Sequence, residues 1–192
     1  MQNNNVKFKI IFFLIFFLSG FLVWGNASAD THTVSGDCSA SVVQTAIDAA
    51  SEGDSIDVTC TGTVTWSTAI TLSGGKTLKG GGVKGSSGTD GTWPLTINVT
   101  LSSASAINIV NDNSQAANRL TGFKFQGTGA PEYIIFVEGK GTGVDGKGAF
   151  RIDNNYFNNV SYTTRMIMTD GTTGKLTGLV DQNIFYTPGS SN

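Results

Sequence analysis

The chain has 192 residues, with 12 Lys or Arg and 14 Asp or Glu, which gives a formal net charge of −2. Only 14% of the residues are charged, and no cluster of Lys and Arg supplies the basic surface that nucleic-acid binding needs. The 25 glycines, together with many Ser, Thr and Asn residues, suit stacked strands with short turns better than amphipathic helices.

The first 29 residues have the pattern of a secretory signal peptide. Lys7 and Lys9 precede an apolar run over residues 10–24, and Ala27-Ser28-Ala29 supplies the small residues that a signal peptidase recognises. An uncleaved membrane anchor is the alternative, but an apolar run of about 15 residues is short for a span that needs roughly 20. We therefore predict secretion to the periplasm or the exterior, a mature chain that begins at Asp30, and no membrane attachment after cleavage.

Two cysteines, Cys38 and Cys60, remain in the mature chain. Export to an oxidising compartment predicts that they form a disulfide, and two buried free thiols are the alternative. A zinc site is disfavoured because it needs four ligands, and no further Cys and only one His are present.

Residues 30–75 are expected to form an N-terminal cap. Apolar residues recur at helical spacing over residues 39–51, where Ser39 or Ser41 can cap a helix. Alternating strands follow at residues 55–60, 63–66 and 69–72.

Residues 76–192 carry an internal repeat. The segment at residues 152–157 returns at residues 180–185, and a fainter copy lies at residues 120–125. A repeat of this period, built only of strands and corners, indicates a β-solenoid. The expected strands are residues 95–101, 106–110, 119–125, 133–138, 149–153, 165–169 and 176–181. Asn155 and Asn183 fall at equivalent corners, where Asn tolerates left-handed backbone angles and can stack as an amide ladder.

The helix at 40–50, a Gly-Asp pair, a strand and the sequence Lys76-Thr77-Leu78-Lys79-Gly80 together resemble the start of right-handed parallel β-helix proteins of the pectate lyase superfamily. The resemblance covers most of residues 37–192. It implies an all-β fold, a right-handed parallel β-helix whose first turn is covered by one short capping α-helix. About four turns are expected, fewer than enzymes of the superfamily usually have, and the chain stops at Asn192 without a recognisable C-terminal cap. We therefore expect a partial chain or one completed by a partner.

The same resemblance implies a polysaccharide as the ligand, possibly an acidic one. Lyases of the superfamily use acids that bind calcium and an Arg or Lys base, but no stretch matches their active-site motifs. The candidate site is therefore built from the repeat: Asp153 and Asp181 should lie in adjacent strands, about 4.8 Å apart, with Arg151 on the same outward face. Stacked carboxylates repel each other, so Arg151, solvent or a cation such as calcium must relieve them. The residues give weak candidates for catalysis (Arg151, Asp153, Asp181) and for a metal (Asp153, Asp181), and no cofactor is certain.

Two loops contain oxygen ligands that could suggest calcium, Asn111-Asp112-Asn113 and residues 141–145, but turn chemistry explains them better. Gly80 to Gly85 matches a dinucleotide-binding spacing without the required helix, so we interpret it as a corner. Several aromatic residues could offer stacking faces for sugar rings, or could simply fill corners: Trp66, Trp93, Tyr156, Tyr162 and Tyr186.

Three classes of function are compatible with these patterns. The first is an enzyme, a lyase or hydrolase acting on polysaccharide. The second is a carbohydrate-binding or adhesive module without catalysis. The third is a structural β-helix whose activity resides in further turns. Whether the chain is an enzyme and which oligomeric state it has are left open by the sequence.

Overall fold

The computed structural model describes residues 28–186 except residues 87–90, 103, 113, 128–130, 141–148, 159–164 and 172–175. The described residues form a predominantly β protein with parallel sheets and a single helix, α2 (Ala40–Ala49). Within that part of the chain no helix has the length and apolar character needed to cross a membrane. Most of the predicted signal peptide lies outside the described residues.

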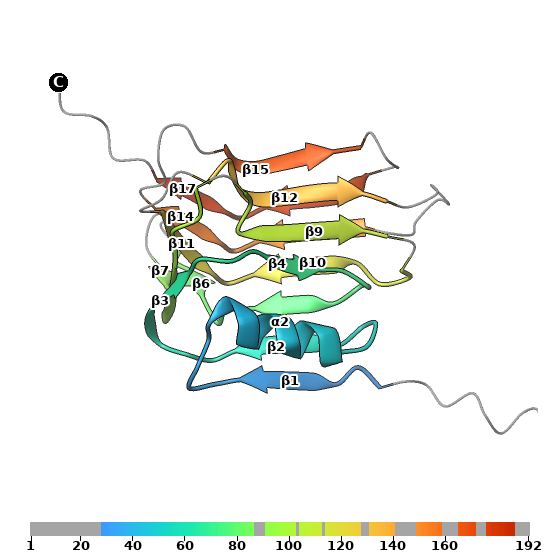
Figure 1. The fold of residues 1–192 in the computed structure, drawn as a ribbon, viewed down its shortest axis with the longest axis horizontal. Coiled ribbons are helices and arrows are strands. Elements are labelled where there is room, and N and C mark those ends of the chain that lie inside the picture. Colours follow the sequence, from blue (N-terminus) through green and yellow to red (C-terminus); the bar gives the residue numbers. More distant parts are fainter. Residues whose placement is uncertain are drawn as a thin grey trace, which may run out of the picture.

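Three parallel sheets make up the body of the molecule (Figure 1). Sheet A has six strands, in the order β1 (Thr31–Val34), β2 (Ser55–Val58), β5 (Thr77–Lys79), β10 (Asn118–Thr121), β13 (Ala149–Asp153) and β16 (Thr177–Asp181). Sheet B has five strands, β3 (Gly62–Trp66), β8 (Leu95–Val99), β11 (Lys124–Gly127), β14 (Tyr156–Asn158) and β17 (Ile184–Tyr186). Sheet C has four strands, β4 (Ile70–Leu72), β9 (Ile107–Asn111), β12 (Tyr133–Gly139) and β15 (Arg165–Asp170). A separate antiparallel hairpin joins β6 (Val83–Lys84) to β7 (Gly91–Thr92).

The chain visits the sheets in a fixed cycle, A then B then C. Four such passes follow one another, β2-β3-β4, β5-β8-β9, β10-β11-β12 and β13-β14-β15, and β16 and β17 begin a fifth. The repeat seen in the sequence is one pass of this cycle, because Ile152 lies opposite Val180 and Phe157 lies opposite Phe185 in the strand register. The sequence repeat is therefore confirmed as a repeat of the structure.

The inward side chains of each sheet stack into columns that form the core. In sheet A the column contains Ile56, Leu78, Leu120 and Ile152, all fully buried. In sheet B the rings of Phe125 and Phe157 are buried and their centroids lie 5.4 Å apart. Because each strand contributes alternate side chains to this interior, the strand alternation in the sequence predicted the core correctly.

Helix α2 covers the end of the stack at which β1 to β4 lie (Figure 1). Its buried residues are Ala40, Val43 and Ile47, and the Gln44 side chain pairs with the backbone of Thr71 in the edge strand β4, accepting from its N–H at 2.6 Å and donating to its carbonyl at 3.2 Å. The helix is shorter than the predicted 39–51. Ser39 occupies the N-cap position as expected, but its side chain makes no capping hydrogen bond.

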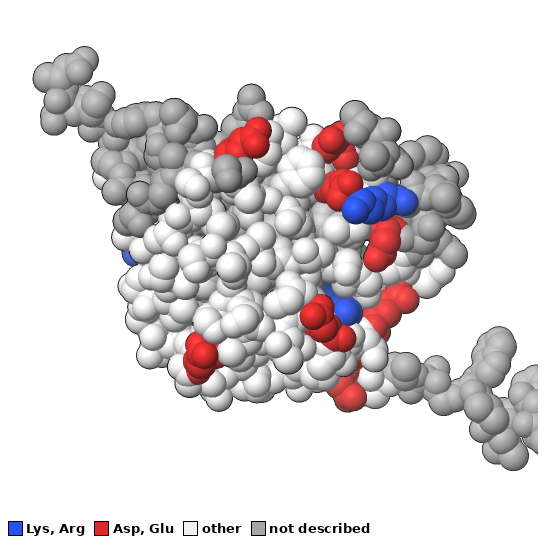
Figure 2. All heavy atoms as spheres, viewed as in Figure 1, with Lys and Arg blue, Asp and Glu red and all other residues white. Residues whose placement is uncertain are grey.

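The side of the molecule that carries α2 and sheet C is mostly uncharged (Figure 2). Few basic groups are seen in this view, on its right-hand side and at its left edge, and acidic groups are scattered over it. The outer face of sheet C is therefore not where the charged candidate residues gather.

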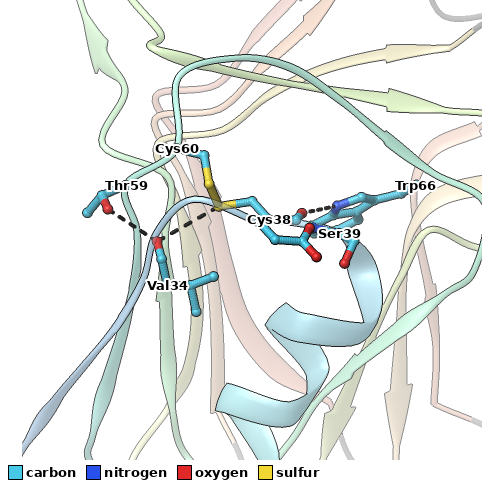
Figure 3. The surroundings of a disulfide bond; sticks show 7 residues. Val34, Cys38, Ser39, Thr59, Cys60 and Trp66 are labelled. Atoms are coloured by element: carbon cyan, nitrogen blue, oxygen red, sulfur yellow. Dashed lines mark hydrogen bonds between the residues drawn. A yellow bond between two sulfur atoms is a disulfide. The ribbon is translucent and has the colours of Figure 1, made fainter.

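The predicted disulfide is confirmed. Cys38, just before α2, is bonded to Cys60, just after β2, with Cα atoms 6.2 Å apart (Figure 3). Nearby, the buried indole of Trp66 donates to the carbonyl of Cys38 at 2.9 Å. The bond and this contact hold the start of the helix against the first pass of strands.

Two expectations about the corners need correction. Residues 119–125 do not form one strand: β10 and β11 are separated by a corner in which Gly122 has φ +78°. The left-handed residues at the equivalent later corners are Asn154 and Gln182, each with φ +55°, and not Asn155 and Asn183. The alignment of the internal repeats placed each corner correctly, but it assigned the left-handed backbone angle to the residue one position too late.

Candidate functional site

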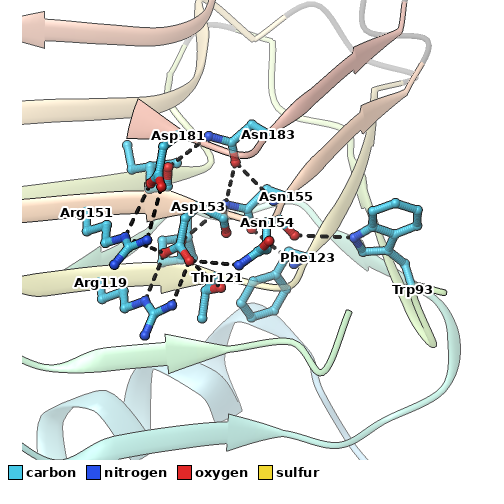
Figure 4. A network of polar contacts seen from close by, with 12 residues as sticks. Trp93, Arg119, Thr121, Phe123, Arg151, Asp153, Asn154, Asn155, Asp181 and Asn183 are labelled. Carbon is cyan, nitrogen blue, oxygen red and sulfur yellow. Dashed lines mark hydrogen bonds and ion pairs between the residues drawn. The ribbon is translucent and has the colours of Figure 1, made fainter. Parts of the chain in front are cut away.

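The predicted site residues lie together on sheet A, in a chain of ion pairs that runs diagonally from strand to strand (Figure 4). Arg119 on β10 donates to both carboxylate oxygens of Asp153 on β13, at 2.8 and 2.6 Å. Arg151 on β13 donates in the same way to Asp181 on β16, at 3.2 and 3.0 Å. Each Arg therefore binds the Asp of the following pass, since the register places Arg119 beside Arg151 and Asp153 beside Asp181.

Asp153 was expected to face water, and the structure corrects this. Its side chain is completely buried beneath the two guanidinium groups, with Arg151 at 3.5 Å, and Asn154 donates a further hydrogen bond at 2.8 Å. Burial alone would raise the pKa of the Asp153 carboxyl, but the hydrogen bonds and charge of Arg119, with a smaller contribution from Arg151, lower it below the usual value. Asp153 is therefore a carboxylate whose hydrogen-bond donors are supplied by neighbouring side chains of the protein.

Sequence reasoning missed Arg119 as a member of this cluster. The signal was present, because Arg119 precedes Thr121 by the same two residues by which Arg151 precedes Asp153. Stacking the repeats in register would have placed Arg119 one strand away from Asp153. The register alone could not show that each Arg pairs with the Asp two positions further along the neighbouring strand, because this depends on side-chain length and direction.

The carboxylates of this cluster have little capacity left for a cation. The four charged groups balance one another, and of them only the side chains of Arg119, Arg151 and Asp181 reach solvent, at 37%, 39% and 27% exposure. Nowhere among the residues with defined positions do three or more His, Cys, Asp or Glu side chains gather closely enough to hold a metal ion. The arginines relieve the repulsion between the stacked aspartates, and the catalytic and calcium roles of Arg151, Asp153 and Asp181 stay predictions.

The predicted amide ladder is present at the corner between sheets A and B (Figure 4). The Asn155 side chain accepts from the backbone N–H of Phe123 at 3.0 Å, and that of Asn183 accepts from the N–H of Asn155 at 2.9 Å. The Asn155 amide also donates to the Asn183 side chain at 3.1 Å. These side chains satisfy backbone groups that the corner removes from the strand ladders, so their role is structural.

A second group of residues lies on the outer face of sheet B. Tyr156 on β14 lies between Trp93, whose ring centroid is 4.9 Å away, and Lys124 on β11, whose Nζ is 5.6 Å from the centre of the tyrosine ring. The Trp93 indole also reaches the carbonyl of Asn154 at 3.4 Å, which joins the loop after β7 to the corner of a later pass. All three side chains are partly exposed.

Glycine gives the Trp93 ring its position. A Cβ atom at Gly82 would lie 2.2 Å from the indole, and one at Gly91 would lie 2.4 Å from it. Gly82 directly precedes β6 and Gly91 lies in β7, and this hairpin, which the sequence did not predict, begins within the Gly80 to Gly85 segment. These glycines therefore serve the packing of an aromatic side chain, and no helix opens on them.

Polar side chains continue this outer face of sheet B. The register places Asn98, Gln126, Asn158 and Tyr186 in one column, one from each of four neighbouring strands. The amides are partly exposed, and Tyr186 is 51% exposed. We call the seven residues that carry this surface the sheet B face: Trp93, Asn98, Lys124, Gln126, Tyr156, Asn158 and Tyr186.

The remaining candidates from the sequence fall elsewhere. Trp66 is fully buried and offers no stacking face. Asp112 accepts hydrogen bonds from the backbone of Gly74 at 3.0 Å and of Ser114 at 2.9 Å, so its carboxylate serves turns, as predicted. Tyr162 and residues 141–145 lie outside the described residues.

Comparisons with protein-family models, with curated proteins and with solved structures give no match for this chain. The family resemblance inferred from the sequence is therefore supported by the parallel sheets and the single helix, and by no relative.

Proposed function

We propose that this chain is a secreted right-handed parallel β-helix that binds polysaccharide on the sheet B face without catalysing a reaction on it. The cyclic path through three parallel sheets supports the coil, and the strong preference of parallel strand connections for one hand supports the right-handed form. The Cys38–Cys60 disulfide and the basic, apolar and small-residue segments of residues 1–29 support export.

The composition of the sheet B face carries the proposal of a glycan ligand. Carboxamides both donate and accept hydrogen bonds, as sugar hydroxyls do, and Gln126 and Asn158 present them on neighbouring strands. Tyr and Trp rings combine an apolar face with a polar edge, so they suit a ligand whose rings are apolar on one side and polar around the rim. Successive strands are about 4.8 Å apart, so the face is a regular array that a repeating polymer can follow.

The ion pairs on sheet A favour binding over catalysis. An acid that assists glycoside cleavage or binds calcium needs a carboxylate oxygen that can reach the substrate or the metal. Arg119 occupies both oxygens of Asp153, and Arg151 occupies both oxygens of Asp181. An enzymatic role through these residues, with calcium, would have to compete with those pairs.

Titration calorimetry with soluble oligosaccharides tests the proposal, using an acidic one (oligogalacturonate) and a neutral one (a cello-oligosaccharide). We expect Gln126→Ala and Tyr186→Ala each to weaken binding by about tenfold, which corresponds to about 1.4 kcal/mol. Tyr133→Ala is the matched control, because it removes a partly exposed ring from sheet C. Equal affinities of the wild type and the three variants would show that sugar does not bind at the sheet B face. If the wild type bound neither the acidic nor the neutral oligosaccharide, the proposal of glycan binding would be refuted.

A further inference from the structure

Asp54, between α2 and β2, holds the start of the mature chain. Its Oδ1 accepts a hydrogen bond from the backbone nitrogen of Asp30 at 2.8 Å, and its Oδ2 accepts from the backbone N–H of Ser51 at 2.7 Å. The Nε2 atom of His32 lies 3.2 Å from Oδ2. Asp54 is only 5% exposed, so its carboxylate is an almost buried acceptor aimed at the residue that the predicted cleavage would make the first of the chain.

We propose that Asp54 is the binding site for the α-ammonium group that signal-peptide cleavage creates on Asp30. Hydrolysis of the Ala29–Asp30 peptide bond by an endopeptidase consumes one water molecule and leaves a carboxylate on Ala29 and a protonated amino group on Asp30. The amide hydrogen bond to Asp54 thereby becomes an ion pair. The inference rests on the cleavage position proposed above and is separate from the glycan site.

The surroundings of Asp54 fit a cationic partner. The hydrogen bonds from the backbone of Asp30 and Ser51 lower the pKa of the Asp54 carboxyl, and burial opposes them only in part, so the group is an anion at neutral pH. The contact with His32 makes a smaller contribution that also lowers this pKa. An ion pair of low exposure is stronger than one on the surface because solvent screens it less.

The other charged groups nearby are already engaged. Glu52 accepts from the backbone of Ala116 at 2.7 Å, and Lys76 donates to the carbonyl of Ile47 at the end of α2 at 2.8 Å. Asp57 lies 3.4 Å from Lys79. Besides His32 at Oδ2, the amino group of Asp30 is therefore the cation placed to pair with Asp54, at Oδ1.

The pair would fasten three elements to one another. The carbonyl of Asp30 accepts from the N–H of Ser55 at the start of β2, at 2.9 Å, and the carbonyl of Asp54 accepts from the N–H of Thr77 at the start of β5, also at 2.9 Å. The end of α2, the start of β1 and two further strands of sheet A thus meet at this carboxylate. Cleavage would tighten the N-terminal edge of the stack only after export, when the leader has been removed.

The test compares two proteins made without the secretion pathway: one that begins at Asp30, released from a fusion by a protease that leaves no extra residue, and one that carries Gly-Ser before Asp30. We expect the melting temperature of the first to be higher by about 2–4 °C at pH 6, the shift expected from a modest ion pair in a domain of this size. In the Asp54→Asn background the two proteins should melt together. His32, which lies 3.2 Å from the Asp54 carboxylate, is present in all four proteins.

The pH dependence gives a second signature. The pair should raise the pKa of the new amino group above its ordinary value of about 7.7–8.0. A group whose pKa is raised by folding stabilises the fold below its unfolded pKa and loses this effect as the pH rises through its folded pKa. The 2–4 °C advantage should therefore be present at pH 6 and lost at about pH 10.

Equal melting temperatures of the two Asp54 proteins at pH 6 would overturn the proposal, as would an advantage that persists in Asp54→Asn. If Asp54→Asn does not fold, acylation of the amino terminus replaces it as a probe. An amino group held by Asp54 should react at least about tenfold more slowly at pH 7 than the amino group of the Gly-Ser protein, and equal rates would again contradict the site. Mass analysis of the exported protein tests the cleavage position independently.

Discussion

At the scale of single residues, Asp153 keeps a negative charge in a place closed to solvent because Arg119 and Arg151 cover it. Arg119→Ala leaves this carboxylate without the two hydrogen bonds that Arg119 donates, and we expect the free energy of unfolding to fall by about 2–3 kcal/mol. The loss is smaller than for a fully buried pair because solvent can enter. Arg151→Ala is the matched control. It should cost about 1 kcal/mol or less, since Asp181 is partly exposed. Urea denaturation of the three proteins measures both values, and equal losses would contradict the special role of Arg119.

The same pair predicts a pH dependence. Because the pKa of Asp153 is lowered by folding, its contribution to stability is present above the unfolded pKa of about 3.9 and is lost as the pH falls through the lower folded value. The stability difference between the wild type and Arg119→Ala should therefore be constant from pH 5 to 7 and shrink below about pH 4. A difference that grew toward low pH would show that the carboxylate is not the group involved.

Substitution at a corner residue is predicted to increase the stability of the fold. Gln182 has φ +55°, a conformation that costs a residue with a side chain about 1–2 kcal/mol, and the equivalent residue of an earlier pass is Gly122. Gln182→Gly should therefore stabilise the protein by about 0.5–1 kcal/mol after the greater entropy of the unfolded glycine chain is subtracted. Asn154→Gly is the informative comparison, because it relieves the same backbone angle but removes a hydrogen bond to Asp153. Thermal unfolding of both variants decides whether backbone angle or side-chain contact dominates.

At the scale of elements, the disulfide joins the segment before α2 to the segment after β2, and it closes a loop with a sequence separation of 22. In the chain-entropy model this closure stabilises the fold by about 3 kcal/mol. The double variant Cys38→Ser/Cys60→Ser should lose about that amount in denaturant unfolding. The oxidised wild type in the same buffer with and without reductant provides the control, and no change on reduction would show that the cap holds through packing alone.

Most elements could be predicted from the sequence because the strands obey a simple alternation. The expected strand at residues 149–153 is β13 itself, and Phe150 and Ile152 point inward as predicted. The β6–β7 hairpin could not be predicted, since its strands are two residues long and are positioned by Trp93, which packs from outside against Gly82 and Gly91. Asp153 was misjudged for a related reason. Alternation gives the direction of a side chain, but its exposure depends on whether long neighbours such as Arg119 fold over it.

At the scale of the whole molecule, the stack has two different ends. Helix α2 covers the first pass, whereas Val180 and Phe185, which occupy core columns, are 43% and 51% exposed at the other end. Phe157→Ala should therefore cost about 3–5 kcal/mol, and Phe185→Ala, the same change one pass later, about 1 kcal/mol or less. Similar costs for the two variants would mean that Phe185 is covered in solution by something beyond the residues described.

The difference between the two ends gives the fold a direction of growth. The ring centroids of Phe185 and Phe157 lie 4.9 Å apart with the rings nearly parallel, and Asn183 repeats the contacts of Asn155. The strands β16 and β17 therefore present the same kind of surface on which they themselves are stacked. Length can therefore be added in whole passes at the β15–β16–β17 end, while at the opposite end α2 packs against β1, β2 and β4. A duplicated pass inserted after Tyr186 should extend the three parallel sheets without disturbing the earlier passes. Inserting half a pass would instead shift each later strand into a different sheet, so that its side chains no longer continue the core columns. We therefore expect stable length variants of this chain to differ by multiples of one whole repeat.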